Sequence, residues 1–255
     1  RREGVGSTRY ASGDKYEGGW RAGQREGRGR AQYANRDRYE GEWKADKKQG
    51  FGTFWAASGE VYEGQWMVGN YEGRGTYVYA SGDVYEGEYK AGKRDGRGVY
   101  MYAAGDMYEG EYRQGRMEGR GTYRLSDGSA EVGRYKAGVD IGEGVRWTPE
   151  RRHAWRLRSG KVIEEISLEE AARIANSLGI PVPAPEQDDG SSGRGKSEPS
   201  VESKGVGATP AEVHAAMSST SGERELSAAF SAMGLPDGGD MEARPSTPLS
   251  MPVAV

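Results

Sequence analysis

The amino-acid sequence predicts an all-β repeat protein made of stacked β-hairpins, followed by one helix and a disordered tail. The first observation is that Tyr recurs every 23 residues without insertion or deletion, at Tyr16, Tyr39, Tyr62, Tyr85 and Tyr108. The second is that each unit alternates aromatic with charged side chains and carries glycines at fixed positions. Alternation with a period of two is typical of a strand, and glycine-rich breaks are typical of turns. Each unit is therefore predicted to be a β-hairpin.

The repeat array is predicted to span residues 3–153, as a partial first repeat and six copies. In the first five copies, a glycine follows the Tyr by two residues and a second aromatic follows by four, at Trp20, Trp43, Trp66, Tyr89 and Tyr112. The sixth copy has Glu131 in place of the Tyr. Because the chain begins with Arg1 and not with Met, we expect it to be a fragment or a processed product.

Within the fourth copy, residues 85–89 and 98–102 alternate as strands, and the segment between them, 90–96, predicts a turn. A glycine before each new copy suits a backbone position with positive φ. In the turn before the second copy Arg36 replaces this glycine, and we expect Asn35 to take the positive-φ position.

A two-stranded hairpin is at best marginally stable in isolation, so the copies must stack on one another. Glycine leaves the backbone bare, and a Tyr or Trp ring can then lie directly against it. The pattern predicts a ladder in which aromatic rings pack against the glycines of neighbouring strands.

The 23-residue spacing YxGxW followed by Gx3GxG resembles the MORN repeat, of the membrane occupation and recognition nexus family. This resemblance implies one elongated, single-layer antiparallel sheet shaped like a half-pipe. The local departures from the pattern are Gly19, Asp46, Phe51 and Glu131.

Residues 154–180 predict a terminal hairpin and a capping α-helix. Ser167 as N-cap and Glu170 three residues later form a capping-box pattern, and Gly179 marks the helix end. The predicted apolar stripe is Leu168, Ala171, Ala175 and Leu178. We expect the helix to close the open end of the sheet; the alternative is a free helix that docks on a partner.

Residues 181–255 predict a disordered acidic tail, because they hold 5 basic and 11 acidic residues and only one aromatic. Leu226, Phe230 and Met233 are spaced as one face of a short helix and are a candidate docking motif for a partner's groove. The alternative is a chance cluster in a low-complexity segment.

The sequence offers no recognisable catalytic chemistry. It has no Cys, and its two histidines, His153 and His214, have no cluster of potential ligands near them in the sequence. Glycine-arginine-glycine segments recur as part of the repeat, without the Gly-Lys-Ser/Thr element of a phosphate-binding loop. We therefore expect a non-enzyme with no cofactor, metal, nucleic acid or small-molecule substrate.

The favoured function is a scaffold or adaptor that binds a partner protein, or a second copy of itself, through the aromatic and glycine face. A single-layer sheet has no second layer to cover that face, so its aromatic side chains are expected to stay partly exposed. The alternative is a self-satisfied ladder with the partner elsewhere. The candidate partner-binding residues are Tyr16, Trp20, Tyr39, Trp43, Tyr62, Trp66, Tyr85, Tyr89, Tyr108 and Tyr112.

Two other functions stay open. The family name implies a membrane tether that binds anionic phospholipids weakly, for which the candidate residues are Lys47, Lys48, Lys93 and Arg94. The resemblance also allows a regulatory fragment of a larger enzyme, such as a phosphatidylinositol phosphate kinase. We expect a cytoplasmic location, with the cytoskeleton, the cilium or the membrane periphery as candidate sites.

Overall fold

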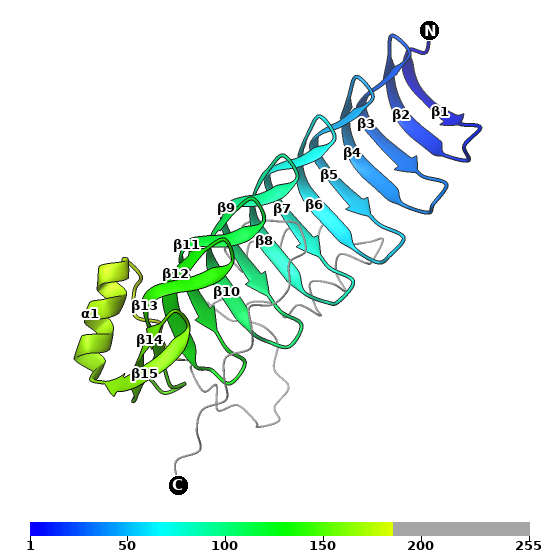
Figure 1. Ribbon diagram of the computed structural model, residues 1–255. Coiled ribbons are helices and arrows are strands. Elements are labelled where there is room, and N and C mark those ends of the chain that lie inside the picture. The colour runs from blue at the N-terminus through cyan, green and yellow to red at the C-terminus, as the bar shows by residue number, and fades with distance from the viewer. Residues whose placement is uncertain (186–255) are drawn as a thin grey trace, which may run out of the picture.

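The computed structural model describes residues 1–185, which form one antiparallel sheet and one helix (Figure 1). The 15 strands follow one another in space in chain order, and each pairs only with its sequence neighbours. The elements are β1 (Gly4–Arg9), β2 (Lys15–Arg21), β3 (Gln24–Gln32), β4 (Arg38–Lys44), β5 (Lys47–Trp55), β6 (Val61–Met67), β7 (Asn70–Val78), β8 (Val84–Lys90), β9 (Lys93–Met101), β10 (Met107–Arg113), β11 (Arg116–Arg124), β12 (Ala130–Lys136), β13 (Val139–Trp147), β14 (Ala154–Arg158), β15 (Lys161–Ile166) and α1 (Leu168–Leu178). The predicted single-layer sheet of hairpin repeats is confirmed.

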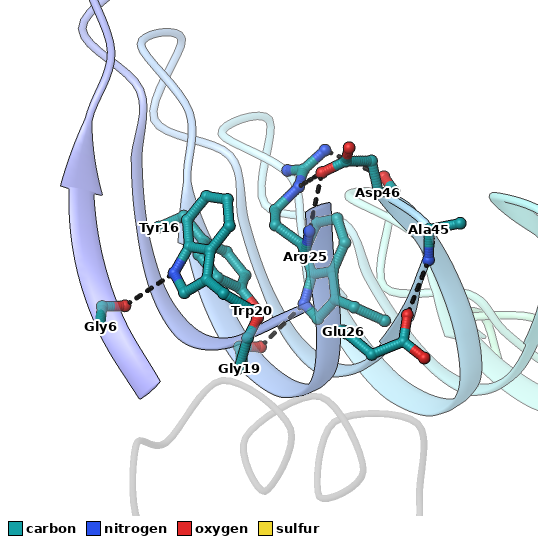
Figure 2. A network of polar contacts seen from close by, with 10 residues as sticks. Gly6, Tyr16, Gly19, Trp20, Arg25, Glu26, Ala45 and Asp46 are labelled. Atoms are coloured by element: carbon teal, nitrogen blue, oxygen red, sulfur yellow. Dashed lines mark hydrogen bonds and ion pairs between the residues drawn. The ribbon is translucent and has the colours of Figure 1, made fainter. Parts of the chain in front are cut away.

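The sheet is long and curved, and Figure 1 shows it as an open trough with the N-terminus at one end and α1 at the other. At about 4.7–4.9 Å between neighbouring strands, the trough is roughly 65–70 Å long. The aromatic ladder lies on its concave side, as Figure 2 shows for Tyr16 and Trp20 in the first repeats. We call this side the inner face and the opposite side the outer face.

The two strands of each repeat are joined by a tight turn that is shorter than the one predicted from the sequence. In the fourth copy the turn is Ala91-Gly92, with φ of 51° and 81°, which fits a type I′ hairpin turn whose twist matches that of the strands. Lys93 already pairs with Lys90, and Arg94 pairs with Tyr89. The prediction of a turn over all of 90–96 is therefore wrong, and the residues after Gly92 belong to a strand.

The turn before β4 also differs from the prediction. Arg36 itself adopts a φ of 77°, and Asn35 does not take the left-handed conformation. The Asn35 side chain instead accepts a hydrogen bond from the Asp37 amide at 3.1 Å and donates one to the Asp37 carboxylate at 2.7 Å. Asn35 thus holds the turn by hydrogen bonds while Arg36 carries the strained backbone.

Acidic side chains connect successive repeats along both long edges of the trough. At one edge Asp37 accepts the amide of Ala57 at 2.8 Å, and at the other Glu26 accepts the amide of Ala45 at 3.0 Å (Figure 2). Equivalent bonds recur along the array, for instance from Ala91 to Glu72 at 2.9 Å. These acids fix the spacing of the repeats, a role that the repeat pattern alone does not reveal.

The helix α1 begins as predicted and packs differently from the prediction. The Ser167 hydroxyl accepts the Glu170 amide at 3.2 Å, and Gly179 ends the helix with a φ of 69°. Leu168 is 45% exposed, so its assignment to the buried stripe is wrong, and Ile174 takes that place. The buried residues of the helix are Ala171, Ile174, Ala175 and Leu178.

The helix covers part of the outer face of the sheet, where it contacts β12, β13 and β14. Its apolar side packs with Val132, Val145 and Trp147 in one buried cluster. The free edge strand β15 remains largely exposed. The helix therefore closes a face of the terminal repeats, whereas we had expected it to close the open end.

Candidate functional site: the aromatic trough

The floor of the trough is built from Tyr rings that lie on glycine backbone. A Cβ added at Gly87 or Gly98 would lie 2.2 or 2.1 Å from the Tyr85 hydroxyl oxygen. The ring thus occupies the space that any larger residue would need. The same contact recurs between Tyr16 and Gly29, Tyr39 and Gly52, Tyr62 and Gly75, and Tyr108 and Gly121. The predicted aromatic–glycine ladder is confirmed.

The second aromatic of each repeat joins neighbouring hairpins. The indole Nε1 of Trp43 donates to the Gly29 carbonyl of the preceding hairpin at 3.1 Å, and Trp20 makes the same bond to Gly6 at 3.2 Å (Figure 2). The Tyr39 ring lies edge-on between two indoles, and its centroid is 5.1 Å from that of Trp43 and 5.2 Å from that of Trp66. Edge-to-face contacts of this kind contribute about 0.5–1.5 kcal/mol beyond area burial. The ladder is therefore continuous across repeats.

All ten candidate partner-binding residues of the ladder are buried, with exposed fractions between 0% and 6%. We had expected them to stay partly exposed, and that expectation is not met. The curvature of the sheet brings the rings of adjacent repeats together, and side chains from a second position close over them. These residues form the core of the fold, and their contact with a partner stays a prediction.

The second position is the residue that pairs with the Trp or Tyr after each turn, namely Arg25, Lys48, Tyr71, Arg94 and Met117. The Lys48 ammonium lies 4.0 Å from the centroid of the Phe54 ring and 4.5 Å from that of Trp66. The Arg94 guanidinium lies 5.0 Å from Tyr112 and donates to the Gly115 carbonyl at 2.7 Å. The signal that would have found these residues is a large side chain every 23 residues beside the turn, which is basic in three of the five copies.

The four candidate lipid-binding residues do not share one surface. Lys48 and Arg94 lie within the trough, and Arg94 is only 4% exposed. Lys47 and Lys93 are exposed beside the hairpin turns. Burial lowers the pKa of Lys48 to about 8, while the surrounding aromatic faces favour its charged form.

The trough is open at its N-terminal end. Half-buried Tyr33 and Phe54 line a hollow of about 510 Å3, with Lys48 beside them and Asp14 and Asp37 also in its wall. Burial raises the pKa of the Tyr33 hydroxyl. The site therefore combines two accessible aromatic surfaces with charges of both signs.

The inner face is more closed from the fourth copy onward. Tyr100, in the second strand of that copy, and Tyr102, which follows the strand, are 9% and 6% exposed. The ladder ends in the sixth copy, where Glu131 replaces the Tyr and forms a buried ion pair with Arg146. Within residues 1–185 there is no group of three or more acidic or His side chains that would hold a metal ion.

Some observations concern features beyond the trough. Within residues 1–185, no helix is long and apolar enough to cross a membrane. The candidate docking motif of Leu226, Phe230 and Met233, and the predicted disordered tail from residue 186 onward, lie outside the described residues. Pro183 and Ala184, at the start of that predicted tail, accept hydrogen bonds from Arg151 at 3.0 Å each.

Comparison with known proteins gives one repeat-family match and solved structures that match only distantly. The TCP domain of Drosophila melanogaster SAS-4, solved with a proline-rich motif of Ana2, is 10% identical, with 61% of this chain and 79% of that chain covered and a TM-score of 0.38. The TCP10 domain of Danio rerio CPAP, solved with a STIL peptide, is 10% identical, with coverage of 64% and 83% and a TM-score of 0.40. No curated protein sequence matches the chain. The MORN repeat profile matches residues 16–38, 39–61, 62–84, 85–107 and 108–130, so these five copies are MORN repeats.

Proposed function

We propose that the chain is a non-catalytic, cytoplasmic scaffold that holds a partner protein in the open N-terminal part of the trough. The observation that carries the proposal is the hollow beside Tyr33 and Phe54, where half-buried aromatic side chains lie next to Lys48. Aromatic residues in such positions are the usual anchors of protein interfaces. The partner's contribution is an apolar side chain that inserts between the two rings.

The buried ladder has a different part in this function. Because its rings are fixed by hydrogen bonds and by neighbouring repeats, it forms a rigid floor that loses little conformational entropy when a partner binds. The partner contacts instead the side chains that line the hollow above the ladder, namely Tyr33, Lys48 and Phe54. This changes the sequence-based hypothesis, in which the ladder residues make the contact.

Site-specific photo-crosslinking tests this proposal on the full chain in cell extract. A photoreactive phenylalanine analogue at position 54 faces the hollow, and the same analogue at the neighbouring position, Thr53, faces the opposite side of β5. We expect a discrete crosslinked product from position 54 alone, and its loss when Tyr33→Asp is added. Equal products from both positions would overturn the proposal. Crosslinks between two copies of the chain would identify the partner as a second copy.

A second candidate, attachment to an anionic membrane, is favoured by one observation. Exposed basic side chains flank the hairpin turns along one long edge, at Arg21, Lys44, Lys47, Lys90, Lys93, Arg113, Arg116 and Lys136. A row of cations along one edge can contact an anionic surface, where each contributes about 1 kcal/mol. Binding to phosphatidylserine vesicles at physiological salt, measured with and without Lys47→Glu and Lys93→Glu, tests this candidate. Tight binding that these substitutions abolish would place it ahead of the scaffold.

A further inference from the structure

The hollow of the proposed function has an equivalent one repeat earlier along the trough. The Tyr10 amide donates to the Asp14 carbonyl at 2.8 Å, and the Tyr33 amide donates to the Asp37 carbonyl at 2.9 Å. The two tyrosines therefore hold the same turn position in successive repeats. Both pack against the aromatic ladder and keep part of their surface exposed. The inner face thus carries two accessible rings that lie one repeat apart.

This row of rings is limited to the first repeats of the trough. The next equivalent residue is Ala56, which has no ring. On the neighbouring row, Ala31 in β3 is equivalent to Phe54 in β5, since each pairs with the ladder Tyr of its own hairpin. The first site therefore consists of Tyr10 beside the small Ala31, and the second site consists of Tyr33 beside Phe54.

The distance between the two sites is set by the sheet. Tyr10 follows β1 and Tyr33 follows β3, so the sites are two strand spacings apart, or about 9.5 Å. A polyproline II helix has three residues per turn and rises about 3.1 Å per residue, so equivalent side chains lie about 9.3 Å apart on one face. Residues on one face of an extended strand are about 6.7 Å apart, and two turns of an α-helix span about 10.8 Å. The polyproline II helix has the period that fits the two sites.

The polar groups of the second site offer hydrogen-bond donors. Within residues 1–185 the Tyr33 hydroxyl has no hydrogen-bond partner, and the Lys48 ammonium has neither a hydrogen bond nor an ion pair. The ammonium lies over ring faces, including those of Phe54 at 4.0 Å and Trp66 at 4.5 Å. A polyproline II segment complements such donors, because its carbonyl groups have no internal hydrogen bonds and Pro has no N–H group of its own.

The wall of the hollow is acidic. Asp14 and Asp37 contribute two carboxylates to it, against the single ammonium of Lys48. Hydrogen bonds hold both carboxylates in place, since Asp14 Oδ1 accepts the Ala34 amide at 2.8 Å and Asp37 Oδ1 accepts the Ala57 amide at 2.8 Å. Complementary charge guides association and fixes the register of a complex. A ligand with a basic side chain next to its apolar residues therefore matches this wall.

We propose that the docking segment of the partner is a proline-rich, basic peptide in the polyproline II conformation that lies along the axis of the trough. One proline lies on Tyr10, and the proline three residues away inserts between Tyr33 and Phe54. The Tyr33 hydroxyl and the Lys48 ammonium donate to carbonyl groups of the peptide. Such a segment is preformed, so it loses little conformational entropy on binding. This proposal rests on the proposed function, because it names the chemistry of the partner, and it extends the site to Tyr10.

Two fluorescent peptides of identical composition test the spacing on the full chain. Both end in arginine, and the probe has proline at every third position, whereas the control has proline at every second position. We expect the probe to bind at least tenfold more tightly, as measured by fluorescence anisotropy. Equal affinities, or tighter binding of an amphipathic helical peptide, would overturn the proposal. Exchange of the arginine for glutamine should weaken probe binding about threefold, and an unchanged affinity would contradict the charge argument.

Substitutions along the row identify the site. Tyr10→Ala and Tyr33→Ala should each weaken probe binding at least tenfold, while circular dichroism and the unfolding midpoint show an intact sheet. The matched control is Phe51→Ala, which should leave binding unchanged, because Phe51 is 55% exposed on the outer face of β5. Tyr33→Phe keeps the ring and removes only the hydroxyl, so it should weaken binding about threefold to tenfold without loss of the fold. If Tyr10→Ala binds the probe as tightly as its parent, the peptide does not lie along the row and the proposal is wrong.

The peptide experiment and the crosslinking experiment can fail separately. If the probe does not bind at millimolar concentration while position 54 still gives its discrete crosslink, the partner belongs to another class and this proposal alone is wrong. If the probe binds with the expected preference and position 54 gives no crosslink in extract, the site has the proposed specificity and the scaffold function fails.

Discussion

The second and fourth copies of the repeat share one backbone and present different surfaces. In both, a buried Tyr lies on a glycine, Tyr39 on Gly52 and Tyr85 on Gly98. Both hairpins turn through two residues with positive φ. The repeat pattern therefore specifies the backbone and its aromatic floor, and it leaves the residues between the glycines free to vary.

On the inner face, these free residues decide whether the trough is open. In the second copy, Lys48 and half-buried Phe54 border the hollow. In the fourth copy, Arg94 bonds the Gly115 carbonyl at 2.7 Å, and both Arg94 and Tyr100 are buried. A Lys presents a compact charge on a flexible stem, whereas the planar guanidinium of Arg stacks and donates in several directions. The comparison suggests that the cation beside the turn tunes how tightly each repeat closes.

On the outer face, the two copies differ even more. Arg38 in the second copy is exposed, and Glu40 beside it forms an ion pair with Arg30 at 2.7 Å. The corresponding residues of the fourth copy are Val84 and Glu86, which are both buried. One repeat can thus carry a charged or a partly apolar outer face without any change to its ladder.

The largest expected effect comes from substitutions in the aromatic–glycine ladder, which the two copies share. Gly98→Ala and Gly52→Ala place a Cβ 2.1 and 2.4 Å from the hydroxyl oxygen of Tyr85 and Tyr39, respectively. Each should reduce the free energy of unfolding by about 3 kcal/mol, since the ring has no free space to move into. Urea unfolding of the full chain measures the loss. Gly6→Ala is the control, because its Cβ would lie at ordinary contact distance, 3.9 Å from Trp20. A difference above about 1 kcal/mol between the two test variants would break the assumption of a common ladder.

A smaller effect separates the two cations. Arg94→Met leaves the Gly115 carbonyl without its donor and should cost about 2 kcal/mol. Lys48→Met should leave stability at pH 7 nearly unchanged, because the methionine fills the same space and removes a charge from an apolar setting. Thermal or urea unfolding of both variants at pH 7 measures the contrast. Equal losses in the two variants would contradict the difference we draw between the second and fourth copies.

The pH dependence of Lys48→Met gives an independent check. The pKa of Lys48 is lowered to about 8 in the folded protein from an ordinary value of 10.5, so between these values the unfolded chain binds more protons. Stability conferred by this group therefore rises as pH increases above about 8. The parent should gain stability relative to Lys48→Met between about pH 8 and 9.5, below the titration of unfolded Tyr. A constant difference over that window would show that the rings hold Lys48 charged.

The sequence predicted the sheet because two periods constrain it together. Alternation within each strand and the 23-residue recurrence of Tyr85 and its equivalents admit few other arrangements. The ladder followed from the same pattern, since a conserved spacing of Tyr and glycine is most simply explained by direct contact within each hairpin. Turn length was less certain, because Lys93 and Arg94 have no strand preference and are ordered by pairing with β8.

The burial of the aromatic rings could not be predicted from the sequence pattern, because it depends on the curvature of the sheet. A flat single sheet would leave Tyr62 or Trp66 partly open, and the curved sheet brings the rings of neighbouring repeats together. The acids that accept amides of the next repeat, such as Asp37, were visible as a periodic series and were not interpreted. The apolar residues of the outer face had a sequence signal too, since Val99 and Met101 are apolar on a face that is charged in the first copies.

The smallest expected effect lies in the turns that lead into the two copies. Arg36 holds a φ of 77° before the second copy, and Gly82 holds a φ of 88° at the same position before the fourth. Because a side chain is unfavourable in this conformation, Arg36→Gly should raise the free energy of unfolding by about 0.5–1 kcal/mol. Asp46→Gly is the matched control. Asp46 also has a positive φ, of 67°, and its carboxylate accepts the Arg25 amide and side chain at 3.0 Å each, so the relief of strain should be offset. Chemical unfolding resolves such differences when the slopes of the transitions agree. If Arg36→Gly brings no gain, the hydrogen bonds of Asn35 to Asp37 already compensate for the strain, and the two turns are energetically equivalent.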